Sequence, residues 1–247
     1  MAASASKSSK SLAISHPIEG LDEPLAQIYT HIHPLVILGV FYFQFDSLVK
    51  KPLESLPRTA IAVALLQVLY VCLCIPGSNY ASLHPNKGKA GPKKKAAASH
   101  SSHAEPGIGF RLVPAFLSLV LSVSLGAPVI AAALILFGAP ITTHQLYTVL
   151  CGLHISLLAV LPLFYVHGVD QPKWMQIAAL NAPVDEVFGA SSGTLVGAWI
   201  GAIPIPLDWD REWQKWPITI ITGAYIGYAI GKMLGGYVFR GSRIKML

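Results

Sequence analysis

Three acidic residues stand two apart near the C-terminal end of the sequence, at Asp208, Asp210 and Glu212. In an extended segment, alternate side chains share one side, so these carboxylates could together bind a hard cation. Arg211 and Lys215 lie close enough in the sequence to neutralise them. Tryptophans stand among and after the acids, at 209, 213 and 216, a combination typical of a membrane–water interface. We therefore favour a structured interfacial turn over a metal site, and we predict no metal ligand.

The segment around these acids is also rich in proline, which restricts the backbone. We expect it to connect two apolar helices as a turn on the luminal side of a membrane. The residues assigned to this luminal turn are Pro204, Pro206, Asp208, Trp209, Asp210, Trp213, Trp216 and Pro217.

Other ionisable residues are weaker candidates for chemistry. His31 and His33 diverge by about 200° on a helix and are poorly placed to share a metal ion. His154 lies deep in an apolar run, where we expect it to form a hydrogen bond between helices. We expect the Lys232 amine to reach the polar boundary along its alkyl chain, with contact to a lipid phosphate as the alternative. Asp46 is expected near the luminal boundary, where a charge is tolerated better than at mid-membrane.

Catalytic apparatus is not evident in the sequence. It contains no phosphate-binding glycine-rich loop that ends in Lys and no His-Glu-x-x-His zinc pair. We also find no nucleophile whose spacing from a base suggests a catalytic pair. We therefore predict no catalytic residue in this chain and no cofactor.

The composition is that of a membrane protein. Of the 247 residues, 53% are hydrophobic and 12% are charged, about half the charged share of a soluble domain. Apolar runs of about 17 to 25 residues are long enough to cross a bilayer. The sequence predicts an all-α polytopic membrane helix bundle of about six transmembrane helices, of which the first is the least distinct. The predicted spans are residues 31–49, 58–76, 112–138, 145–167, 187–207 and 217–239.

The distribution of Lys and Arg predicts the orientation of these spans. The larger share of basic residues outside the spans falls on the side that holds both termini, so we place both termini in the cytosol. The formal net charge of +6 then lies next to anionic lipid, and we expect no nucleic-acid partner. The predicted regions are a polar cytosolic N-terminal segment (1–30), a first transmembrane hairpin (31–76), a disordered cytosolic loop rich in Lys, Ser and Ala (77–111), and a four-helix transmembrane region (112–247).

Glycine recurs at every fourth residue in the last two predicted spans. Helices in lipid associate through close backbone contact, which small residues allow. A step of four residues advances by about 400°, so each series forms an oblique groove on one helix face. Either the two grooved helices pack on each other, or one groove faces outward and receives a helix of another protein. The two series are Gly189, Gly193, Gly197 and Gly201, and Gly223, Gly227, Gly231 and Gly235.

The segment 180–231 contains Gly-Ala-Trp, then Pro-Ile-Pro-Leu-Asp-Trp-Asp, then Trp-Gln and Trp-Pro. In this order and spacing it closely resembles the signature region of the PIG-F family, a multi-spanning endoplasmic-reticulum protein of GPI-anchor biosynthesis. The N-terminal half of the chain carries little of this resemblance. The resemblance implies a non-catalytic subunit in the endoplasmic-reticulum membrane. Such a subunit stabilises the ethanolamine-phosphate transferases that modify the second and third mannoses of the GPI-anchor precursor.

The same resemblance implies the catalytic subunits of these transferases as partners, with phosphatidylethanolamine or the GPI precursor among the membrane lipids near the complex. One alternative is a multi-spanning lipid phosphotransferase, for which only the acids at 208–212 are available. The other is a lipid or small-molecule transporter that would use Lys232, His154 and Asp46 as a path through the membrane.

Overall fold

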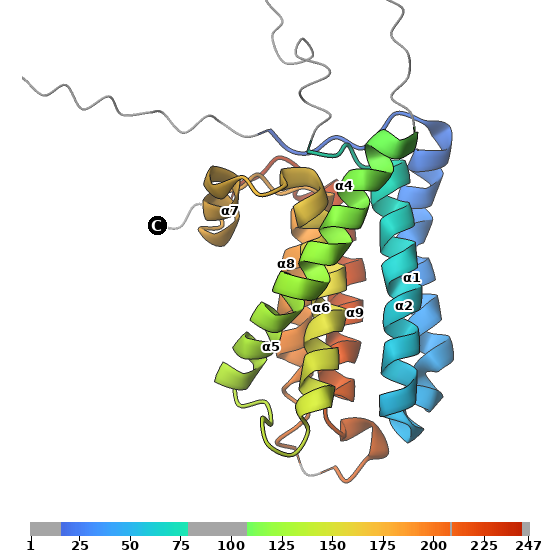
Figure 1. The fold of residues 1–247 in the computed structure, drawn as a ribbon, viewed down its shortest axis with the longest axis vertical. Helices are drawn as coiled ribbons and strands as arrows, with labels where there is room; N and C mark the ends of the chain where they lie inside the picture. Colours follow the sequence, from blue (N-terminus) through green and yellow to red (C-terminus); the bar gives the residue numbers. More distant parts are fainter. Residues whose placement is uncertain (1–15, 79–107, 208, 244–247) are drawn as a thin grey trace, which may run out of the picture.

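The computed structural model describes residues 16–78, 108–207 and 209–243. Within these ranges the regular elements are all helical, and most of the helices run along one common axis (Figure 1). The long helices are α1 (Pro24–Lys50), α2 (Pro52–Cys74), α4 (Ile108–Leu121), α5 (Ala127–Leu136), α6 (Gln145–His167), α8 (Glu186–Gly201) and α9 (Ile218–Met233). The shorter elements are α7 (Gln171–Ala178), the π-helical turns η1 (Ser122–Gly126) and η3 (Leu234–Val238), and the 3-10 turn η2 (Glu212–Gln214).

Five helical segments of the described chain are long and apolar enough to cross a membrane. Helix α8 has 16 residues, fewer than the about 20 that a span usually needs. The all-α membrane bundle is confirmed in this coarser form, whereas the sixth span and the orientation of the termini stay predictions. The five segments are Pro24–Lys50, Pro52–Cys74, Gly109–Leu136, Gln145–His167 and Ile218–Val238.

Several helix boundaries differ from the predicted spans. Helices α1 and α2 begin earlier, at Pro24 and Pro52. Proline suits the first position of a helix because its φ is already helical and the N–H that it lacks would have no intrahelical partner there. The third predicted span is divided by the π-helical turn η1, which ends at Gly126, two residues before Pro128 of α5. Proline cannot donate a helical hydrogen bond, so the regular ladder is interrupted there.

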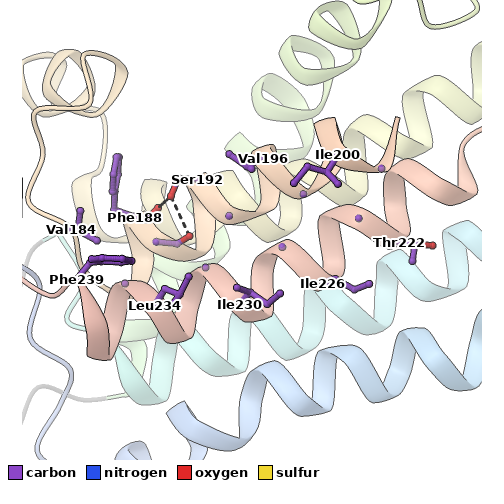
Figure 2. A pocket seen from close by; sticks show the side chains of 18 of the residues that line it. Val184, Phe188, Ser192, Val196, Ile200, Thr222, Ile226, Ile230, Leu234 and Phe239 are labelled. Atoms are coloured by element: carbon purple, nitrogen blue, oxygen red, sulfur yellow. Dashed lines mark hydrogen bonds between the residues drawn. The ribbon is translucent and has the colours of Figure 1, made fainter. Parts of the chain in front are cut away.

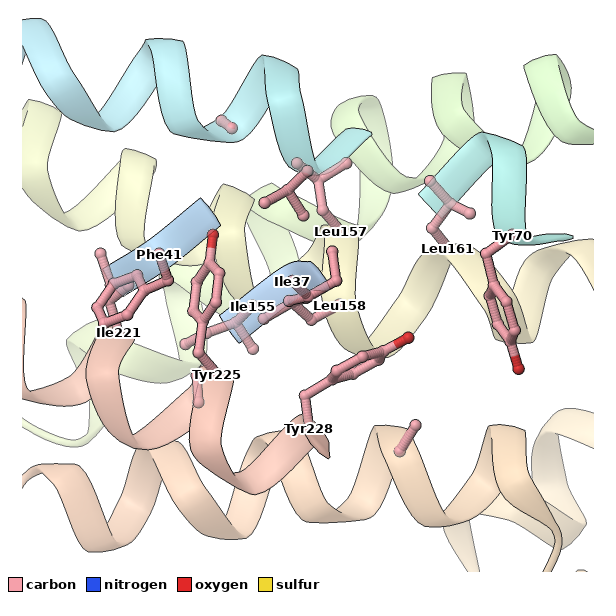
Figure 3. Close-up of a cluster of buried hydrophobic side chains, with 14 of the residues drawn as sticks. Ile37, Phe41, Tyr70, Ile155, Leu157, Leu158, Leu161, Ile221, Tyr225 and Tyr228 are labelled. Carbon is pink, nitrogen blue, oxygen red and sulfur yellow. The ribbon is translucent and has the colours of Figure 1, made fainter. Parts of the chain in front are cut away.

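Helix α6 occupies the centre of the bundle. Its most apolar stretch is 83% buried, against 28% for that of α1. Figure 3 shows Leu157 and Leu158 of α6 and Tyr225 and Tyr228 of α9 among the side chains of one buried cluster. Because α6 is covered on most sides, the remaining helices present their outer faces to the surroundings.

His154 joins α6 to two neighbouring helices. Its Nε2 lies 3.0 Å from the Leu56 carbonyl oxygen of α2, and its Nδ1 lies 2.7 Å from the Tyr225 hydroxyl of α9. A carbonyl can only accept, so Nε2 donates to Leu56 and Nδ1 accepts from Tyr225. This is the predicted hydrogen bond between helices.

The described ends of the chain lie at the same end of the bundle as α7 (Figure 1). There the Leu21 amide donates to the Cys74 carbonyl at 2.9 Å, and the Val184 amide donates to the Ser242 carbonyl at 2.8 Å. We call this the α7 end. The opposite end, called the turn end, carries the connection between α8 and α9. The segments 1–15 and 79–107 lie outside the described residues, so the predicted disorder of the Lys-rich loop stays a prediction.

Candidate functional site: the hairpin of α8 and α9

The two glycine series face each other at backbone contact distance. A Cβ atom built on Gly193 would lie 2.6 Å from the Gly231 Cα atom, and one built on Gly197 would lie 2.8 Å from the Gly227 Cα atom. Ordinary carbon contacts begin near 3.4 Å, so even a methyl group has no room. The structure therefore packs the two grooves on each other, the first of the two predicted arrangements. The further facing contacts join Gly189 to Gly235, Gly223 to Gly201, and Gly201 to Thr219 and Ile220.

This close approach brings backbone atoms of one helix against those of the other. The nearest neighbours of each built Cβ are backbone atoms, including carbonyl oxygens of the opposite helix. Contacts of this kind allow weak Cα–H···O hydrogen bonds and dense van der Waals packing, which are the main sources of helix association in lipid. The hairpin is therefore held by backbone packing, and both glycine series are needed for it.

An apolar groove of about 880 Å³ runs along one side of this hairpin. Figure 2 shows Val196 and Ile200 of α8 beside it, and Ile226 and Ile230 of α9 on its other side. These four side chains are between 47% and 55% exposed. We call this surface the hairpin groove. It extends from Val184, Phe239 and Arg243 at the α7 end to Pro204 and Trp213 at the turn end.

Two hydroxyl groups that line the hairpin groove, those of Ser192 and Thr222, are bonded within their own helices, whereas the Thr219 hydroxyl has no partner among the described residues. The Ser192 hydroxyl donates to the Phe188 carbonyl at 2.8 Å, and the Thr222 hydroxyl donates to the Ile218 carbonyl at 2.7 Å. Both side chains line the groove. Because their donors are already satisfied, an occupant of the groove needs no polar group opposite them.

Gln214 organises the luminal turn, whose place on the luminal side of the membrane stays a prediction. Its amide nitrogen donates to the carbonyls of Pro204 at 2.8 Å and Leu207 at 2.5 Å, and its amide oxygen accepts from the Arg211 backbone N–H at 3.0 Å. One side chain thus closes the turn by three hydrogen bonds. Sequence reasoning did not assign Gln214 to the turn; the Trp-Gln pair of the PIG-F resemblance is the signal that points to it.

The acidic residues of the luminal turn differ in their partners and backbone conformations. Glu212 forms an ion pair with Lys215, one of the two bases predicted to neutralise the acids. Asp210 has a φ of 45°, a left-handed conformation that Asp and Asn adopt more readily than most residues. Asp208 lies outside the described residues. Within the described ranges, no three His, Cys, Asp or Glu side chains come together as a metal site.

The tryptophans of the turn occupy both exposed and covered positions. Trp209 is 52% exposed, and its ring meets the Trp213 ring edge-on at a centroid distance of 5.8 Å. Trp216 packs against the hydrophobic core and precedes Pro217 through a cis peptide bond. Pro206 lies in the irregular stretch that follows α8.

Asp185 caps the first turn of α8. Its Oδ1 accepts from the backbone N–H groups of Val187 at 3.0 Å and Phe188 at 2.9 Å, and its Oδ2 accepts from the Ile18 N–H at 3.1 Å. Burial raises the pKa of Asp185, and these hydrogen bonds oppose that effect. Asp185 therefore fixes both the start of the hairpin and the segment that precedes α1. Sequence reasoning gave it no role, although Asp before an apolar run is a helix-start signal.

Lys232 does not extend to the polar boundary as predicted. Its residue is 3% exposed, and its Nζ lies 3.3 Å from the centroid of the Tyr70 ring on α2. His33 stacks on the same ring at 4.4 Å, whereas His31 bonds to Tyr237. The two histidines thus have separate partners, in line with the predicted divergence.

The hairpin also contains the spacing of a hydrolase nucleophile, Gly-x-Ser-x-Gly, from Gly189 to Gly193. In hydrolases this motif forms a sharp turn between a strand and a helix, which exposes the serine. Here it lies inside α8, and Ser191 is 6% exposed. The match therefore reflects the glycine spacing of the helix interface.

Comparison with known proteins extends the resemblance well beyond the hairpin. Residues 32–236 match the model of the family described as GPI biosynthesis protein family Pig-F. No solved structure matches the chain.

Three relatives illustrate the similarity. Glycosylphosphatidylinositol anchor biosynthesis protein 11 of Neurospora crassa is 43% identical over 237 residues, which cover 96% of this chain and 84% of that protein. The protein of the same name from Aspergillus fumigatus is 40% identical over 247 residues, covering 88% of this chain and 82% of that protein. The human GPI ethanolamine phosphate transferase, stabilizing subunit, is 35% identical over 105 residues, covering 40% of this chain and 48% of that protein. The chain therefore belongs to the Pig-F family of GPI biosynthesis proteins.

Proposed function

We propose that this chain is a non-catalytic accessory subunit that binds and stabilises GPI ethanolamine-phosphate transferases through the hairpin groove. The name of the human relative supports the transferase as partner, and the family supports the pathway. The transferases concerned modify the second and third mannoses of the GPI precursor in the endoplasmic-reticulum membrane. Phosphatidylethanolamine and the GPI precursor then lie in the membrane around the complex.

The observation that carries this proposal is the hairpin groove itself. Its occupant is a transmembrane helix of the catalytic subunit. The groove follows α8 and α9 from the α7 end to the turn end, so it matches an elongated apolar partner. A helix is the element that can lie there in lipid with its own backbone groups satisfied. Half-exposed apolar side chains on both sides then provide van der Waals contact.

The luminal turn supports an architectural role. Gln214 bonds to three backbone groups of the turn, and Glu212 is engaged by Lys215. These polar groups hold the connection between α8 and α9 in shape. In this proposal Asp208 and Asp210 do the same, and the metal-dependent chemistry belongs to the partner.

The proposed topology has six membrane crossings with both termini in the cytosol. Helix α8 supports the sixth crossing because it accompanies α9 from Gly189, opposite Gly235, to Gly201, opposite Thr219. The described ends of the chain also lie together at the α7 end (Figure 1), as an even number of crossings requires. The luminal turn then faces the side opposite the termini.

Site-specific photo-crosslinking tests the groove. A photoreactive amino acid is placed at Ile230 in the groove or at Leu65 on α2, which is 67% exposed and lies outside it. We expect the catalytic subunit to be captured from Ile230 and not from Leu65. Ile230→Trp should also lower the amount of catalytic subunit that co-purifies, whereas Leu65→Trp should not. Equal capture from both positions, together with unchanged co-purification of Ile230→Trp, would refute the groove as the binding site.

A further inference from the structure

A second pocket, of about 410 Å³, lies at the α7 end of the bundle. It is formed by the segment before α1, the first half of α1, the end of α2, the start of α8 and the end of the chain after α9. In contrast to the hairpin groove, charged and other polar side chains form much of its wall. Its lining residues include Glu19, Asp22, His31, Glu186, Tyr237 and Arg240.

The two signs of charge in this pocket come from different segments. Glu19 and Asp22 belong to the segment that precedes α1, and Glu186 is the first residue of α8. Arg240 follows η3, and His31 lies on α1, where it bonds to Tyr237. The pocket can therefore present carboxylates to one part of a ligand and a guanidinium to another part.

Lys232 adds a buried positive charge behind this pocket. Its Nζ has no hydrogen-bond acceptor among the described residues. Its attractive electrostatic neighbour is Glu186, which lines the pocket. A buried ammonium is stabilised by the Tyr70 ring, but it still favours a negative charge nearby. With Lys232 included, the acids Glu19, Asp22 and Glu186 face the bases Arg240 and Lys232, so both signs of charge are present with one negative charge in excess.

We propose that this pocket binds a zwitterionic headgroup that consists of a phosphate and a primary ammonium. The phosphate lies toward Arg240 and the buried charge of Lys232, and the ammonium lies toward Glu19 and Asp22. The presence of both signs of charge favours such a ligand over a purely anionic one. A primary ammonium donates hydrogen bonds to carboxylates, which a quaternary ammonium cannot do.

The surroundings of the pocket favour a membrane lipid as the source of this headgroup. The pocket lies beside η3, where Tyr237 and Val238 are 59% and 64% exposed. These apolar side chains provide a surface for acyl chains that continue from the headgroup. The site is at the bundle end opposite the luminal turn and shares no lining residue with the hairpin groove, so binding there does not require a transferase partner.

Lipid-dependent stability of the purified chain tests this site. A ligand that binds the folded state raises the unfolding temperature. We add phosphatidylethanolamine, phosphatidylcholine or phosphatidylglycerol with identical acyl chains to the detergent-solubilised protein. Phosphatidylethanolamine should give the largest rise. An equal rise with free phosphoethanolamine would support the same headgroup site with a soluble source, whereas a larger rise with phosphatidylglycerol, or equal rises with all three lipids, would overturn the proposal.

Variants link the effect to the pocket. Arg240→Gln and Asp22→Asn each remove one charged partner and should weaken phosphatidylethanolamine binding about tenfold, the effect of a lost charged hydrogen bond. Lys173→Gln on α7 is the matched control, since Lys173 is 46% exposed and lies outside this pocket. Arg240 is exposed, so Arg240→Gln should fold. Binding by Arg240→Gln and Asp22→Asn as tight as that of the control would contradict the assignment.

Discussion

Gly193→Ala tests whether backbone packing between α8 and α9 holds the hairpin. The new methyl carbon would lie 2.6 Å from the Gly231 Cα atom, where ordinary contact begins near 3.4 Å. To relieve this overlap, the helices must separate locally by about 0.8 Å, and a gap of about 0.5–1 Å already removes a quarter to a half of each dispersion contact. The obstructing atoms are backbone, so no side chain can rotate away.

The expected loss of stability follows from two opposing effects. Overpacking a tight interface destabilises by about 1–3 kcal/mol, and a rigid backbone neighbour places Gly193→Ala at the upper end. Replacing Gly by Ala inside a helix returns about 1 kcal/mol. We therefore expect a net loss of about 2 kcal/mol in the free energy of unfolding. In a protein that already carries Gly193→Ala, Gly227→Ala should lower the free energy of unfolding by less than it does on its own. The reason is that Gly193→Ala has already separated the two helices.

Reversible unfolding in mixed detergent micelles measures this loss. Gly39→Ala is the matched control, because Gly39 lies in helix α1 with no neighbour within 4 Å of a built Cβ. Its stability should stay unchanged or rise slightly. If Gly193→Ala were as stable as Gly39→Ala, the close packing of the two glycine series would be wrong.

Three further predictions concern the ends of the hairpin. Gln214→Ala should destabilise the luminal turn by about 1–3 kcal/mol and increase its cleavage in limited proteolysis; unchanged cleavage would exclude its organising role. Asp208→Asn should retain function, whereas Asp208→Ala should lower the yield of the complex with the transferase. The transferase turnover per assembled complex should stay normal in both variants. If Asp208→Asn assembled fully but lost turnover, Asp208 would be a metal ligand instead. A glycosylation reporter after Leu247 should stay unmodified and one near Lys215 should be modified, and the reverse pattern would invert the proposed topology.

The helical spans could be predicted from hydropathy because a backbone in lipid must satisfy its own hydrogen bonds, which a helix does within one segment. The span 145–167 coincides with α6. Hydropathy did not reveal the first residues of α1 and α2, where proline begins the helix, or the π-helical turn η1 within the third span. These features depend on local backbone geometry, which an average over apolar residues does not contain.

Residues that join distant parts of the chain were harder to predict. Asp185 bonds to Ile18, 167 positions away, and Lys232 lies on the Tyr70 ring of another helix. Sequence reasoning placed Lys232 near the end of its span and expected it to reach outward. The neighbouring helix instead covers it, so its contacts depend on how the helices rotate and pack.

The sequence by itself determined that the last two predicted spans carry a surface of small residues, because a four-residue period places every glycine of a series near one helix face. It also determined the family, through the signature segment 180–231. Only the tertiary structure decided that the two series face each other, since helix period does not specify the rotation of one helix toward the next. For the same reason, the hairpin groove became visible only when both helices were in place.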